Sequence, residues 1–153
     1  MKIYIASDHG GYQLKNELKS FLSDANYIVK DMGPFELNPL DDYTDFVFPL
    51  AERVARSKAD LGIVLGRSGN GEAIAANKVK GIRAAVCLNE IMAKKAREDN
   101  NANILSMGSD FIDVKKAGKI ASVFIETEFT GLDRHERRLK KISLYETGLI
   151  KEK

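Results

Sequence analysis

Short runs of apolar and β-branched residues alternate along this chain with longer stretches in which apolar residues recur at helical spacing. The short runs are almost continuously hydrophobic, which is typical of strands whose two faces are both covered. They lie at residues 2–7, 27–32, 61–66, 83–87 and 103–107. Because these runs alternate with helical patterns, we expect repeated βαβ units and a mainly parallel, five-stranded sheet.

The longer stretches predict the helices that cover this sheet. Leu14, Leu18 and Leu22, for example, would share one face of an amphipathic helix. Later helices are predicted at 71–78, 89–99, 114–126 and 134–147, and residues 33–42 form the one long irregular connection. The predicted fold is therefore an open α/β sheet in three layers, whose ligands usually bind beyond the carboxyl ends of the strands. We expect functional residues in the strand-to-helix turns.

The composition fits one compact domain. The chain has 153 residues, of which 44% are hydrophobic, enough for a single sizeable core within residues 1–153. Its 24 basic and 22 acidic residues give a formal net charge of +2, too balanced for a protein dedicated to nucleic acid or a membrane surface. A small anionic ligand is compatible with this balance.

Cys87 is the only cysteine, so no internal disulfide can form. It ends the apolar run at 83–87 and is interpreted as a buried structural thiol rather than a nucleophile. The chain has neither a signal-peptide pattern nor an apolar run of about 18 residues. Together these features predict a cytoplasmic protein.

The first chemically unusual turn is Ser-Asp-His-Gly-Gly at residues 7–11, directly after the opening strand. Asp8 could simply cap the following helix by accepting a backbone hydrogen bond. His9 would lie at the carboxyl edge of the sheet beside a helix N-terminus, where it could donate to a phosphate or a sugar hydroxyl. A structural histidine is the alternative.

The second turn is Gly-Arg-Ser-Gly-Asn-Gly-Glu at 66–72, which also follows a strand. Its G-x-x-G-x-G spacing is neither the dinucleotide fingerprint nor a P-loop. Glycines allow successive N–H groups to form an anion-binding concavity, although a plain tight turn explains one or two of them. Glu72 could merely complement the helix dipole, or it could be a base beside an oxyanion site.

The third turn precedes the last helix, where Asp133 and Glu136 have the D-x-x-E form of a capping box. Arg134 and Arg138 are four apart and share a helix face. These cations near the positive end of the helix dipole favour a bound anion such as phosphate, whereas the alternative is a solvated basic face. No recognised nucleic-acid motif supports a nucleic-acid contact.

The order of these motifs resembles that of the ribose-5-phosphate isomerase B family. The matching segments are 7–11, 66–72, Ala-Ala-Asn-Lys at 75–78, and Arg-His at 134–135. Asp-Asp-Tyr at 41–43, and Asn100-Asn101 followed by Gly108, extend the resemblance over essentially the whole chain. It implies a Rossmann-like single domain in a homodimer or tetramer, with the active site at the subunit interface and the helix at about 134–147 packing on a partner subunit.

The resemblance also implies an activity. The family interconverts ribose 5-phosphate and ribulose 5-phosphate without a metal or organic cofactor, and some relatives use allose 6-phosphate or galactose 6-phosphate. One branch has a cysteine base on the third strand, near Leu65 of this chain, and the other has a glutamate after the glycine loop. This chain resembles the glutamate branch, so Glu72 inherits the role of the base that moves a proton between C2 and C1 through a cis-enediolate.

Further roles follow from the same resemblance. Ser68, with the loop amides of Gly69, Asn70 and Gly71, would stabilise the oxyanion. The positions matched to substrate contacts are Asp8, His9, Tyr43 and Asn100, with Arg134 and Arg138 matched to the phosphate.

Three positions depart from the family pattern. Asp99 stands where the family usually has a ring-opening histidine; it could act as a base on the anomeric hydroxyl or be a solvated surface residue. Asp110 replaces an arginine that often helps to hold phosphate, and Arg67, where many members have glycine, could supply a compensating cation. Hexose-phosphate isomerisation and a non-catalytic phosphosugar-binding module therefore stay open as alternatives.

Overall fold

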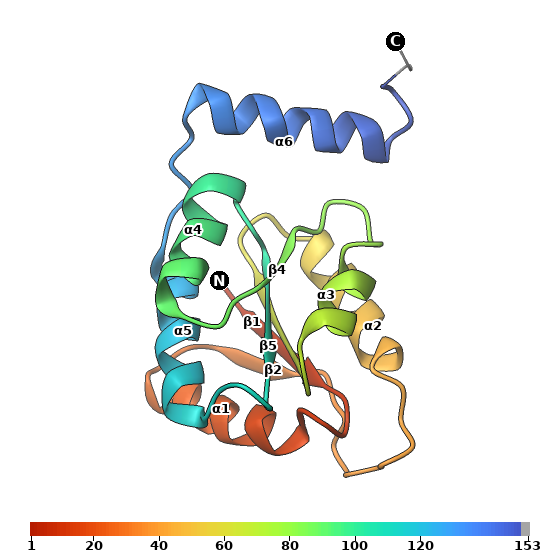
Figure 1. Ribbon diagram of the computed structural model, residues 1–153, viewed down its shortest axis with the longest axis vertical. Coiled ribbons are helices and arrows are strands. Elements are labelled where there is room, and N and C mark those ends of the chain that lie inside the picture. The colour runs from red at the N-terminus through yellow and green to blue at the C-terminus, as the bar shows by residue number, and fades with distance from the viewer. Residues whose placement is uncertain (151–153) are drawn as a thin grey trace.

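The computed structural model describes residues 1–150 and contains a wholly parallel, five-stranded sheet (Figure 1). Its strands are β1 (Ile3–Ser7), β2 (Val29–Asp31), β3 (Leu61–Gly66), β4 (Ala84–Val86) and β5 (Ile104–Gly108). The order across the sheet is β2-β1-β3-β5-β4, and every neighbouring pair is parallel. The predicted five-stranded α/β architecture is confirmed.

Helices cover both faces of the sheet, so the molecule has three layers. They are α1 (Tyr12–Asp24), α2 (Thr44–Ala55), α3 (Asn70–Ala76), α4 (Glu90–Asn100), α5 (Val114–Glu126) and α6 (Asp133–Glu146). The helices α1, α4 and α5 lie on one face, whereas α2 and α3 pack together on the other. None of these helices, within residues 1–150, is long and apolar enough to cross a membrane.

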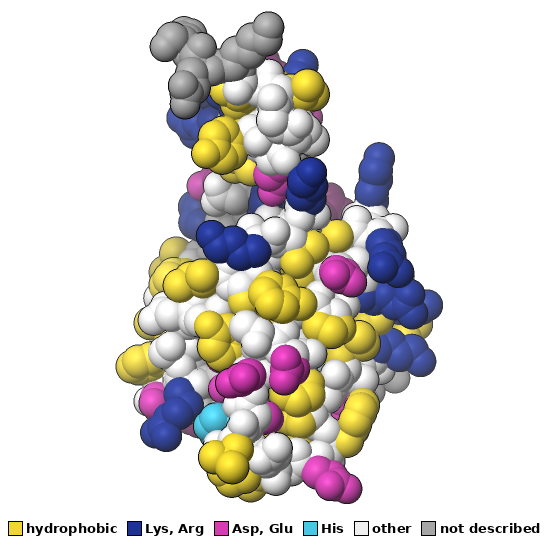
Figure 2. Space-filling model, turned by 90° about the vertical axis from the view of Figure 1, so that its right-hand side faces the viewer, with side chains coloured by type: hydrophobic (Ala, Val, Ile, Leu, Met, Phe, Trp, Pro, Cys, Tyr) yellow, Lys and Arg dark blue, Asp and Glu magenta, His cyan; other side chains and the backbone are white. Residues whose placement is uncertain are grey.

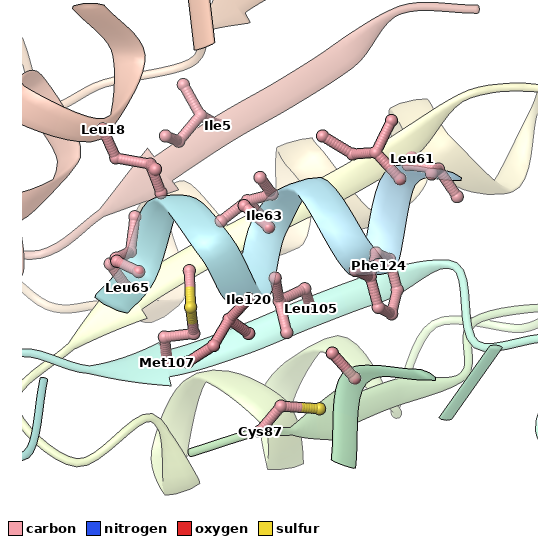
Figure 3. Close-up of a cluster of buried hydrophobic side chains, with 14 of the residues drawn as sticks. Ile5, Leu18, Leu61, Ile63, Leu65, Cys87, Leu105, Met107, Ile120 and Phe124 are labelled. Atoms are coloured by element: carbon pink, nitrogen blue, oxygen red, sulfur yellow. The ribbon is translucent and has the colours of Figure 1, made fainter. Parts of the chain in front are cut away.

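The central strands are buried along their whole length, which explains their continuous hydrophobicity. Alternate residues face opposite layers: Ile5 of β1 joins the larger core under α1 and α5, and its neighbour Tyr4 joins the smaller core under α2 and α3. Figure 3 shows the larger core, which contains Ile63 and Leu105 of adjacent strands and Phe124 of α5. Each such fully buried side chain contributes about 1.5–3 kcal/mol to stability.

Cys87 belongs to this larger core, as its sequence context predicts. The thiol is 1% exposed, and burial raises its pKa to about 11. Because the thiolate is the reactive form, burial lowers the reactivity of this cysteine at neutral pH.

The last helix, α6, lies across the amino end of the sheet and stands apart from the three layers (Figures 1 and 2). Only His135 among its residues is buried, and Ile142 and Tyr145 are 47% and 77% exposed. Lys and Arg side chains gather on and below the helix in Figure 2. Its far end is held where the carboxylate of Glu146 accepts a 3.1 Å hydrogen bond from the backbone N–H of Gly81.

Two capping interpretations are corrected by the structure. The N-cap of α6 is Leu132, so Asp133 lies inside the first turn, where its charge suits the helix dipole but its side chain accepts no capping bond. The N-cap of α1 is Gly11, and Asp8 instead accepts a 3.0 Å bond from the Gly11 N–H, which closes the turn ahead of that helix.

Candidate active site

The turns after β1, β3 and β5 lie side by side at the carboxyl edge of the sheet, because parallel strands all end there. Backbone hydrogen bonds join them: the N–H of Asp8 donates to the Leu65 carbonyl, at 3.3 Å, and that of Ser109 to the Gly66 carbonyl, at 2.9 Å. The hydroxyl of Ser109 donates to the Gly10 carbonyl, at 2.8 Å. Two of the three predicted turns are thus assembled into one site by neighbouring strands.

Glycines permit this close approach. A Cβ on Gly11 would overlap the Leu65 carbonyl, so only glycine lets the first turn lie against β3. Gly69 has a φ of +79°, a left-handed conformation, and caps α3, while its carbonyl accepts a 2.6 Å bond from the Ser106 hydroxyl. The loop is fixed by its neighbours before any ligand binds.

Backbone donors point out of the glycine loop at the start of α3. The first N–H groups of a helix have no carbonyl one turn earlier to accept them. That of Asn70 donates to the Ser68 hydroxyl, at 3.2 Å, and the helix's own ladder starts with Ala73 donating to Gly69. The amide of Gly71 lies between these two bonds, where an oxyanion would be stabilised.

Glu72 lies at the centre of this edge. It is 4% exposed, and its carboxylate packs so closely on Gly66 that a Cβ there would overlap both oxygens. Burial raises the pKa of Glu72, its bond to its own backbone lowers it, and the nearby charge of Asp8 raises it further. A carboxylate with a raised pKa beside backbone donors is suited to general-base chemistry near neutral pH.

Tyr43 and His9 approach this part of the protein from other segments. The Tyr43 ring packs over Gly71, whose Cβ would lie 3.0 Å from the ring's Cζ. His9 donates from Nδ1 to Asp41 Oδ1, at 2.7 Å, and its backbone N–H donates to the same oxygen, at 3.0 Å. These bonds raise the pKa of His9, a shift that burial opposes and the charge of Asp8 reinforces. A role for Asp41 could not be predicted from the sequence, because its bond to His9 depends on the path of residues 33–42.

Arg67 and Asp110, two departures from the family pattern, face each other. Arg67 lies over Gly10, and its Nε donates to Asp110 Oδ2, at 3.3 Å. Asp110 thus partly neutralises Arg67, the residue that was expected to compensate for the loss of an arginine at position 110. Both side chains are exposed, so this pair adds little to stability.

The remaining predicted residues lie at the opposite edge of the sheet. Asp99 and Asn100 end α4, which runs antiparallel to the strands, and Arg134 and Arg138 belong to α6 beside them. The five residues of β5 separate the two edges by about 16 Å. One chain therefore does not bring these four residues to Glu72.

Local contacts organise this second group. Arg134 Nε donates to His135 Nε2, at 3.0 Å, and His135 Nδ1 lies 3.7 Å from Asp99 Oδ1 and 3.3 Å from the Thr130 hydroxyl. Asn100 lines a cavity of about 420 Å³ between α4 and the edge strand β4. Arg138 is exposed. Within residues 1–150, no group of three or more His, Cys, Asp or Glu side chains could hold a metal ion.

Comparison with known proteins places these features in one family. The family model described as Ribose/Galactose Isomerase matches residues 3–142. Ribose-5-phosphate isomerase B of Mycolicibacterium paratuberculosis is 39% identical over 146 residues, covering 95% of this chain and 92% of the relative.

Solved structures give the same result over the whole fold. Ribose-5-phosphate isomerase B of Clostridium thermocellum is 45% identical with a TM-score of 0.92, covering 98% of this chain and 100% of the other. The enzyme of Mycoplasma genitalium, with bound ribulose 5-phosphate, is 41% identical with a TM-score of 0.91, covering 95% and 96%.

Proposed function

The chain belongs to the ribose/galactose isomerase family, and we propose that it is an aldose–ketose isomerase that interconverts ribose 5-phosphate and ribulose 5-phosphate with Glu72 as its base. The role of Glu72 as the base is supported by its position: the side chain is buried against Gly66, with the residue 4% exposed, in the first turn of α3. A carboxylate so placed has both a raised pKa and donors beside it.

The reaction moves one carbon-bound proton. Glu72 removes the proton from C2 of the open-chain aldose, the electron pair forms the C1–C2 double bond of a cis-enediolate, and the aldehyde oxygen becomes the oxyanion. Glu72 then returns the proton to C1, while the hydroxyl proton of O2 passes to O1, which leaves the C2 ketone. No bond to another group forms or breaks, and no electrons leave the sugar.

The glycine loop would stabilise the charge that develops on oxygen. Ser68 and the amides of Gly69, Asn70 and Gly71 surround the start of α3, where Ser68 already contacts an amide. Removing one such preorganised donor typically raises the barrier by about 2.7–4 kcal/mol. Because these donors can support an enediolate, we propose that neither a metal nor an organic cofactor takes part.

A second subunit would supply the other half of the site. Asp99, Asn100, Arg134 and Arg138 lie at the edge of the sheet opposite Glu72 of their own chain, so we propose a homodimer in which they face the partner's Glu72. The arginines would bind the phosphate with charge-assisted bonds, and Asp99 would act on the anomeric hydroxyl. The exposed apolar side chains of α6 would pack on the partner. The reduced lone cysteine fits a cytoplasmic location.

Mixing two inactive variants tests this shared site. Glu72→Gln and the double variant Arg134→Ala/Arg138→Ala should each lose activity, for different reasons. After subunit exchange, about one quarter of wild-type activity should return, because half of the dimers are mixed and each then has one intact site. A mixture that stays inactive after exchange would contradict the shared site.

The substrate is tested by following aldose-to-ketose conversion by NMR with ribose, allose and galactose phosphates under identical conditions. We expect the five-carbon substrate to be converted with the highest kcat/KM. Faster conversion of a six-carbon substrate would assign the chain to hexose phosphates. Binding without conversion of any of them would overturn the isomerase function and favour a phosphosugar-binding module.

A further inference from the structure

His9 of the turn after β1 and Asp41 of the connection after β2 form a pair at the same edge of the sheet as Glu72. One oxygen of Asp41 accepts from both the backbone N–H and the ring Nδ1 of His9, at 3.0 Å and 2.7 Å. The Asp41 side chain is 6% exposed, whereas that of His9 is 35% exposed. The buried Asp41 carboxylate thus binds one side of the His9 imidazole, and the ring is partly exposed to solvent.

The segment that carries Asp41 is anchored to the body of the protein. Lys15, which is fully buried, donates to the Pro34 carbonyl, at 2.8 Å, and the Tyr12 hydroxyl donates to the Phe35 carbonyl, at 3.1 Å. At its start, the backbone N–H of Ser7 donates to the Gly33 carbonyl, at 3.1 Å. These bonds hold residues 33–35, the start of the connection, against β1 and α1, and the two bonds to His9 hold Asp41 at its other end.

The charges near His9 come from four segments. Asp8 lies on its own turn, Asp41 on the connection after β2, and Arg67 with its partner Asp110 on the turns after β3 and β5. The two aspartates face His9 directly and favour its protonated form, while the charge of Arg67 is offset by Asp110. The chain's other histidine, His135, already has Nε2 bonded to Arg134.

We propose that Asp41 is a positioning residue that fixes His9 with Nδ1 bonded inward, so that Nε2 serves as a charged donor to the phosphate of the sugar substrate. The identity of that anion rests on the proposed function; the orientation and charge of the ring do not. A carboxylate on Nδ1 sets the ring's orientation and stabilises the imidazolium, and a charged donor binds phosphate more strongly than a neutral one.

The test begins with NMR titration of the ring protons, which is simple because the chain has two histidines. In the wild type, His9 should titrate above its value in the urea-unfolded chain. Asp41→Asn should lower its pKa toward the ordinary 6.5, whereas Glu36→Gln, which removes an exposed charge from the same connection, should leave it unchanged. His135→Gln assigns the two signals.

Activity provides the second readout. At a pH above the ordinary histidine pKa, Asp41→Asn should raise KM for the phosphosugar about fivefold, equivalent to about 1 kcal/mol, and change kcat little. The KM of the wild type should rise as pH increases through the His9 pKa, and this rise should begin at lower pH in Asp41→Asn.

The outcomes separate this proposal from the enzyme's function. If His9 titrates in folded wild type as it does in the unfolded chain, or if Asp41→Asn remains folded and leaves the titration unchanged, the role of Asp41 is overturned. The wild-type comparison decides the matter even if the variant fails to fold. If the titration shifts as expected but no aldose phosphate is converted, the proposed isomerase function fails while the His9–Asp41 pair stands.

Discussion

The Gly66→Ala substitution is expected to displace the side chain of Glu72, and so to remove its function as a base, while residue 72 itself stays a glutamate. Gly66 ends β3 with no positive φ, so alanine suits its backbone, and the strand itself should tolerate the change. The added Cβ, however, would overlap the Glu72 carboxyl group and lie 2.8 Å even from its more distant oxygen, Oε2. The side chain must therefore leave its buried position.

The size of the effect follows from what the base contributes. General acid–base catalysis is typically worth 10²- to 10⁴-fold, so kcat should fall by roughly that factor, equivalent to about 2.7–5.5 kcal/mol of barrier. KM should change less, because the arginines proposed to hold the phosphate are not displaced. Initial rates of ketose formation from ribose 5-phosphate, with a melting curve for each variant, measure both effects.

Gly62→Ala is the matched control, because it adds the same methyl group to the same strand away from the site. Its Cβ would lie 2.8 Å from Leu50 Cδ2 and 3.0 Å from Ile104 Cγ1, both in the core. Overpacking of this kind costs about 1–3 kcal/mol of stability, so Tm should fall while kcat stays near the wild-type value. A folded Gly66→Ala enzyme with wild-type kcat would refute the placement of Glu72.

Three further results are expected. Burial raises the pKa of Glu72, and the base must be ionised to accept a proton. The acidic limb of a pH–rate profile of kcat/KM should therefore have an apparent pKa above the ordinary glutamate value of 4.5. Because the Glu72 carboxyl group has a higher pKa in the folded chain than in the unfolded chain, its ionisation at neutral pH destabilises the fold. Glu72→Gln should therefore have a higher Tm than wild type at neutral pH. This gain in Tm should shrink as pH falls toward 4.5, where the wild-type carboxyl group becomes protonated. Cys87, with its pKa of about 11, should resist iodoacetamide in the native protein and react after unfolding in urea, as mass spectrometry would show.

The sequence predicted the centre of the fold better than its edges. Residues of β1, β3 and β5 are buried on both faces, so an uninterrupted apolar run is their direct consequence. The edge strands β2 and β4 are half exposed and span three residues each, fewer than the 27–32 and 83–87 predicted for them. Where one side of a strand meets solvent, composition no longer marks its ends.

The sequence could predict which candidate residues lie close together where they follow adjacent strands of the sheet. Asp8 and Glu72 follow adjacent strands, so a parallel sheet places both at one edge. The bond between His9 and Asp41 spans 32 residues and depends on an irregular connection with no periodic pattern, so spacing could not reveal it. Asp99 lies at the opposite edge of the sheet from Glu72 because of the direction of α4, which becomes clear only once the sheet order is known.

The role of Glu72 is tested most directly by the rate at which the Glu72→Gln enzyme converts ribose 5-phosphate to ribulose 5-phosphate, followed by NMR. Glutamine keeps the shape of the side chain and cannot accept the C2 proton, so kcat should fall by roughly 10²- to 10⁴-fold in a protein at least as thermostable as wild type. A folded Glu72→Gln enzyme that isomerises the sugar at the wild-type rate would show that another group moves the proton.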